Sequence, residues 1–105
     1  MITVSETQAF IRSTGFWGDD EREEFITWIA ANPDAGDLIV GSGGLRKVRW
    51  RRKGMGKSGG ARIITYYVSS EGQVWLLIGY TKSKFDNLST EFLALLRKEI
   101  DHGRP

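Results

Sequence analysis

The 105-residue chain contains no cysteine and a single histidine. Without thiols it forms neither disulfides nor thiolate metal sites, and His102 alone cannot build a zinc site. No apolar run approaches the ~18 residues of a membrane span, and the N-terminus lacks the pattern of a signal peptide. We therefore expect a cytoplasmic protein with no metal, no cofactor and no membrane contact.

Acidic residues are missing from the middle of the chain, between Asp37 and Glu71. Residues 38–70 carry a formal charge of +8 and residues 1–37 a charge of −6, although the whole chain carries only +2. Such segregation predicts a basic strip on a small domain. The strip consists of Arg46, Lys47, Arg49, Arg51, Arg52, Lys53, Lys57 and Arg62. Because side chains alternate along a strand, Lys47, Arg49 and Arg51 are expected on one face and Arg46 and Arg52 on the other.

Two explanations of the basic strip differ in their consequence for function. A solvated edge strand uses lysine to prevent pairing with another sheet, which accounts for two or three of the charges. Eight cations without interspersed acids crowd like charges, and this costs stability unless an anion or an acidic partner relieves it. The pattern therefore favours a surface that binds a polyanion.

The length and the twelve aromatic residues indicate one domain spanning residues 1–105. Strands are expected at Met1–Ser5, Leu45–Arg51, Ala61–Ser69 and Gln73–Thr81, and helices at Thr7–Ser13, at Asp20–Ala31 and from Ser89 to about Gly103. The last helix is expected to line one side with Phe92, Leu95, Leu96 and Ile100. The predicted fold class is α+β, an antiparallel meander sheet with N-terminal helices and a C-terminal helix on one face.

The sequence Gly56-Lys57-Ser58 resembles the end of a phosphate-binding P-loop, but the motif fails. Its first glycine would fall at position 51, which is Arg51. A strand pattern follows Ser58, so no helix N-terminus is available to hold a nucleotide phosphate. The glycine-rich run is better interpreted as a hairpin connection that lets Lys57 approach a phosphate.

A second group of cations follows the last predicted strand, at Lys82 and Lys84, directly after Tyr80. In a meander, this exit lies near the start of the neighbouring strand, where Arg62 shares a face with Ile64, so the group is expected to converge on Arg62 and Lys57. Lysine, arginine and tyrosine together can hold RNA phosphates and stabilise charge on a phosphorane without metal. The alternatives are a rim arginine paired with a helix carboxylate and a tyrosine that belongs to the core.

Four motifs carry a resemblance to a known family. They are Gly-Gly-Leu-Arg-Lys at 43–47, Gly-Lys-Ser-Gly-Gly-Ala-Arg at 56–62, Leu-Ile-Gly-Tyr-Thr-Lys at 77–82 and Asp-Asn-Leu-Ser at 86–89. Over nearly its whole length the chain resembles the HigB-type branch of the RelE/ParE toxin superfamily. The resemblance implies a RelE-like microbial RNase fold and the toxin half of a type II toxin–antitoxin module. It also implies ribosome-dependent cleavage of mRNA in the A site and neutralisation by a cognate antitoxin, usually a HigA-like helix-turn-helix protein.

The resemblance also implies roles for individual residues. The catalytic set is Lys57, Arg62, Tyr80, Lys82 and Lys84, and the residues expected to bind RNA or the ribosome are Arg46, Lys47, Arg49, Arg51, Arg52 and Lys53. The expected reaction is attack of the substrate's 2′-hydroxyl on the adjacent phosphate. Lys57 or Lys82 would act as base or electrostatic stabiliser, Arg62 would hold the phosphorane, and Tyr80 would stack on or orient the nucleotide.

Two alternatives remain open from the sequence. Members of the ParE-like branch poison DNA gyrase and do not cut RNA, and a plain RNA-binding module would carry the same basic surface without catalysis. The concentrated cations around Lys57 and Arg62 favour the ribonuclease.

Overall fold

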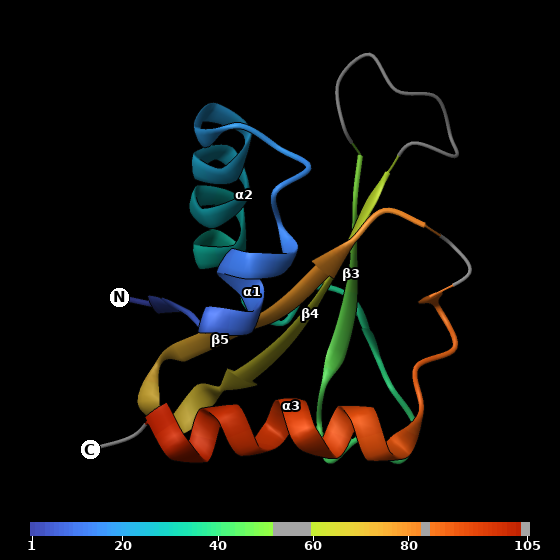
Figure 1. The fold of residues 1–105 in the computed structure, drawn as a ribbon. Helices are drawn as coiled ribbons and strands as arrows, with labels where there is room; N and C mark the ends of the chain where they lie inside the picture. Colours follow the sequence, from blue (N-terminus) through green and yellow to red (C-terminus); the bar gives the residue numbers. More distant parts are fainter. Residues whose placement is uncertain (52–59, 83–84, 104–105) are drawn as a thin grey trace.

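A five-stranded sheet in the order β1-β5-β4-β3-β2 forms the centre of the fold (Figure 1). This computed structural model describes residues 1–51, 60–82 and 85–103, with side chains to residue 100. The strands are β1 (Thr3–Glu6), β2 (Asp37–Leu38), β3 (Arg46–Trp50), β4 (Ala61–Val68) and β5 (Gln73–Tyr80), and the helices are α1 (Gln8–Ser13), α2 (Asp19–Ala31) and α3 (Thr90–Gly103). The α+β class and the three helices are therefore confirmed.

The meander is confirmed for β3, β4 and β5, which pair antiparallel in sequence order. Strand β1 departs from it, because it pairs parallel with β5 at the far edge. The short strand β2, which the sequence pattern did not indicate, pairs antiparallel with β3 at the opposite edge. Helices α1 and α2 lie in the chain between these two edge strands.

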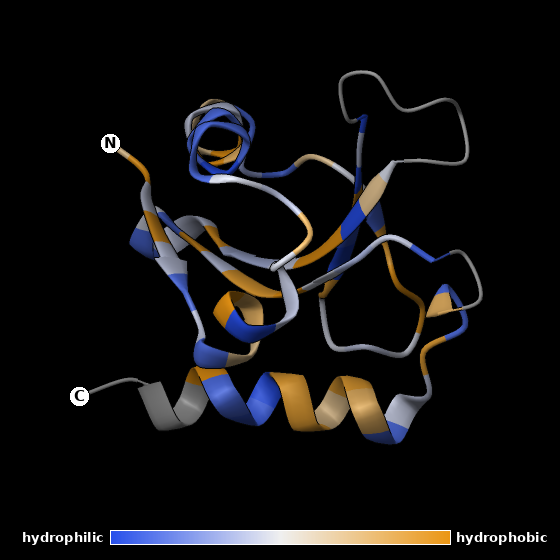
Figure 2. Ribbon diagram, turned by 45° about the horizontal axis from the view of Figure 1, so that its top comes forward, coloured by the Kyte–Doolittle hydropathy of each residue, from blue (hydrophilic) through white to orange (hydrophobic). Residues whose placement is uncertain are grey.

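The expectation that all helices pack on one face is wrong. Strand β4 buries Ile63 in one core with Phe10 of α1 and Phe25 of α2, whereas its neighbour Ile64 belongs to a second core with Leu96 of α3. The strands lie between α2 and α3 in Figure 1. Both faces are covered because β4 and β5 carry buried residues on both of their faces. Helix α2 carries mostly hydrophilic residues (Figure 2).

The second core is completed by α3. Ser89 caps this helix as expected, since its Oγ accepts a hydrogen bond from the backbone N–H of Phe92 at 3.1 Å. The buried face consists of Leu93, Leu96 and Ile100. The predicted face was partly wrong, because Phe92 and Leu95 are 37% and 59% exposed.

A β-bulge in β5 decides which way the end of the strand faces. Ile64 pairs with Ile78 and Thr65 with Leu76, which leaves Leu77 as the extra residue. Trp75 and Tyr80 are five residues apart and would face opposite sides of a regular strand, yet both belong to the α3-side core. The bulge therefore turns Tyr80 to the face on which Arg62 lies.

None of the helices within the described ranges is long and apolar enough to cross a bilayer.

Candidate functional site

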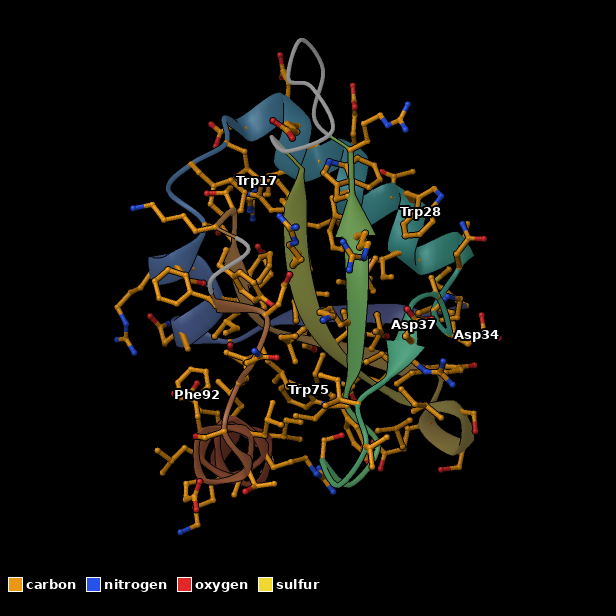
Figure 3. All side chains as sticks on the ribbon, turned by 90° about the vertical axis from the view of Figure 1, so that its right-hand side faces the viewer. Trp17, Trp28, Asp34, Asp37, Trp75 and Phe92 are labelled. Atoms are coloured by element: carbon orange, nitrogen blue, oxygen red, sulfur yellow. The ribbon has the colours of Figure 1, made fainter. Side chains whose placement is uncertain are left out.

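Three chemically active side chains lie in one row across the sheet. Arg49 of β3 is opposite Arg62 of β4, and Arg62 is opposite Tyr80 of β5. We call these residues the arginine–tyrosine row. In Figure 3, β3 and β4 lie in the centre of the view, and the chain that leads into α3 descends beside them. The row places two guanidinium groups and a phenol on neighbouring strands, a suitable arrangement for an anion.

Arg62 is the fixed member of the row. It is only 8% exposed, and its Nη1 donates hydrogen bonds to the carbonyl oxygens of Gly60 at 3.2 Å and Thr81 at 3.1 Å. Its Nε lies 3.4 Å from Asp86 Oδ1, an ion-pair distance, but makes no hydrogen bond with any described residue. The guanidinium is thus held in place by two carbonyl oxygens and one carboxylate.

Tyr80 is held beside Arg62 by a hydrogen bond. Its Oη donates to Asp86 Oδ1 at 3.0 Å, and the ring of Phe85 packs edge-on against it with centroids 6.3 Å apart. Burial raises the pKa of Tyr80 well above its ordinary value of 10.0, and the hydrogen bond to Asp86 and its charge act in the same direction. Arg62 and Arg49 partly oppose this rise. Tyr80 therefore keeps its proton near neutral pH and can donate a hydrogen bond but cannot act as a base.

Asp86 is the residue that sequence reasoning did not place in the site. Its Oδ1 contacts both Tyr80 and Arg62, so one carboxylate joins the ends of two strands. It lies two residues before Leu88, which packs against the α3-side core. The signal that could have identified it is its position as the first acidic residue after the last strand. Arg62 is indeed paired with a carboxylate, although not with one from a helix.

The remaining predicted cations divide between the two faces of the sheet. Lys47 lies on the face of the row, two residues before Arg49 on β3 and two after the core residue Leu45. Arg46 lies on the opposite face, where its Nη1 donates to the carbonyl of Gly36 at 3.2 Å. The alternation predicted for this strand is confirmed, and it removes Arg46 from the site.

Two further predicted cations flank the row. Arg51 follows β3 and Lys82 follows β5, and both are exposed. Arg52, Lys53, Lys57 and Lys84 lie outside the described residues.

No group of three or more metal-ligating side chains is found in the part of the chain that the structure describes. A comparison with protein-family models finds no family that matches this chain.

Proposed function

We propose that this protein is the toxin of a type II toxin–antitoxin system, an endoribonuclease that cuts mRNA in the ribosomal A site. The observation that supports the proposal is the arginine–tyrosine row, in which the fixed guanidinium of Arg62 lies between exposed Arg49 and protonated Tyr80. Fixed cations of this kind stabilise charge on phosphate oxygens without reorganising during the reaction.

The proposed reaction is an internal transesterification. The 2′-oxygen of the nucleotide attacks the adjacent phosphorus, the bond from phosphorus to the 5′-oxygen breaks, and the products are a cyclic phosphate and a free 5′-hydroxyl. A base removes the proton of the 2′-hydroxyl, and a proton is delivered to the leaving 5′-oxygen.

We assign the following roles to the residues of the row and its neighbours. Arg62 and Arg49 stabilise the negative phosphorane, and Tyr80 orients the nucleotide. Lys57 and Lys82 remain the proposed bases or electrostatic stabilisers. Asp86 positions Tyr80 by accepting a hydrogen bond from its hydroxyl at 3.0 Å. Since no histidine is proposed for the site, we expect cleavage to be weak without the ribosome, which would supply positioning.

The basic surface also suits an acidic partner. A cognate antitoxin of the helix-turn-helix type would neutralise the toxin in the proposed system, and the exposed cations Arg49, Arg51 and Lys82 offer it charge complementarity.

The proposal is tested with purified protein on translating ribosomes, by mapping the 5′ ends of the message. We expect cuts within translated codons, a rate at least tenfold lower for Arg49→Ala, and a larger loss for Arg62→Ala. Arg49 is exposed, so its variant tests the chemistry without disturbing the fold. Arg12→Ala is the matched control, since Arg12 is an exposed arginine on α1.

Two other results would overturn the proposal. Uncut messages together with inhibited gyrase supercoiling would identify a gyrase poison. Tight RNA binding with no cut, on or off the ribosome, would identify a binding module.

A further inference from the structure

A hollow of about 320 Å³ lies beside the arginine–tyrosine row. It is lined by Ile39, Val40, Lys47, Asp86, Asn87 and Leu88, and so lies between the β2–β3 edge of the sheet and residues 86–88. This volume is at the lower end of the range of about 300–1,000 Å³ typical of small-molecule sites. The hollow is therefore large enough for one small planar group.

The lining of the hollow has two chemical characters. Ile39, Val40 and Leu88 provide apolar surface, and Val40 is 95% exposed at the rim. Lys47, Asp86 and Asn87 provide a cation, a carboxylate and an amide. A nucleobase matches this combination, because its faces are apolar while its edges carry hydrogen-bond donors and acceptors.

Asp86 connects the hollow to the row. The same residue lines the hollow and contacts Arg62 and Tyr80. Both of these contacts use Oδ1. A base in the hollow would thus lie next to a phosphate held at Arg62. One RNA strand can supply both groups, because each base is adjacent to the phosphate that links its nucleotide to the next.

We propose that the hollow binds the base next to the scissile phosphate and selects bases that carry an amino group. An ionised carboxylate accepts hydrogen bonds and donates none, so Asp86 favours bases with N–H groups on their pairing edge. Guanine presents two such groups side by side and is expected to bind most tightly. Uracil presents one N–H between two carbonyl oxygens, which the carboxylate repels. This inference rests on the proposed function for the identity of the ligand as RNA.

The test is equilibrium binding of fluorescent 2′-O-methyl oligonucleotides, which cannot be cleaved, to the purified protein. Four uridine hexamers differ only at one central position, which is guanine, adenine, cytosine or uracil. The guanine hexamer is expected to bind roughly tenfold more tightly than the uracil hexamer, as one good bidentate contact discriminates. Asp86→Asn should reduce this preference to about twofold, because the amide keeps one acceptor for Tyr80 but loses the charge.

Two other variants complete the experiment. Asn87→Ala removes an exposed amide from the hollow and should weaken the preference without affecting folding. Asp20→Asn makes the same charge change on α2 and should leave the preference intact. Equal affinity for all four hexamers, including the absence of binding, or a preference unchanged in Asp86→Asn, would overturn the inference.

The outcome is separable from that of the proposed function. Base-selective binding without cuts on ribosomes would retain the hollow and reject the ribonuclease. Cuts on ribosomes together with binding indifferent to the base would retain the ribonuclease and reject the hollow.

Discussion

The buried guanidinium of Arg62 makes a quantitative prediction about stability. Arg62→Met keeps much of the side-chain volume but removes both hydrogen bonds to the carbonyls of Gly60 and Thr81. Hydrogen bonds to charged groups contribute about 1.5–3 kcal/mol each, and lengths of 3.1–3.2 Å place these at the weak end. We therefore expect the free energy of unfolding to fall by about 3 kcal/mol.

Part of this loss is expected to depend on Asp86. At 3.4 Å from Arg62 Nε, full charges at an effective dielectric of about 20 would interact by roughly 5 kcal/mol, an upper bound. The side chain of Asp86 is 23% exposed, so water screens the pair. Removing the unpaired carboxylate with Asp86→Asn should therefore recover about 1–2 kcal/mol, within the range for residues in contact.

The assay is a double-mutant cycle measured by equilibrium urea unfolding, followed by tryptophan fluorescence. Arg49→Met is the matched control, because it makes the same change at the exposed neighbour of Arg62 in the row and should alter stability by no more than about 0.5 kcal/mol. A loss below about 1 kcal/mol in Arg62→Met, or strict additivity with Asp86→Asn, would refute the reasoning.

The turn before β2, the β1–α2 ion pair and the phenol of Tyr80 carry three more predictions. Gly36 has a φ of +91°, and a Cβ there would lie 2.6 Å from the backbone oxygen of Lys47. Gly36→Ala should therefore lower the free energy of unfolding, measured with urea, by about 3 kcal/mol. A loss under about 1 kcal/mol would contradict this. Arg22 donates two hydrogen bonds to Glu6, at 2.8 and 2.7 Å, from a partly exposed position, so Glu6→Gln should cost about 1 kcal/mol at low salt and less in 1 M NaCl; an effect independent of salt would exclude an ionic origin. Folding raises the pKa of Tyr80, so the contribution of its protonated phenol to the free energy of unfolding is complete below about pH 10 and is lost as the pH rises further. Tyr80→Phe should therefore flatten the fall in stability at alkaline pH. An unchanged profile in pH-dependent urea unfolding would count against the buried phenol.

The sequence by itself determined the local features of this protein. The β-branched and aromatic runs at 61–68 and 73–80 form β4 and β5, and the hydroxyl oxygen of Ser89 caps α3. Alternation along β3 correctly assigned Lys47 and Arg49 to one face and Arg46 to the other. Such features depend on neighbours in the chain, so their physics is visible in short windows.

Only the tertiary structure decided how these elements combine. The parallel pairing of β1 with β5 and the cover of both sheet faces depend on contacts between segments far apart in the chain. The bulge that leaves Leu77 unpaired turns Tyr80 toward Arg62, and periodicity gives no sign of it. The pairing of Asp86 with Arg62 joins residues that are 24 positions apart in the chain. Long-range packing, which no local pattern encodes, thus set the chemistry of the site.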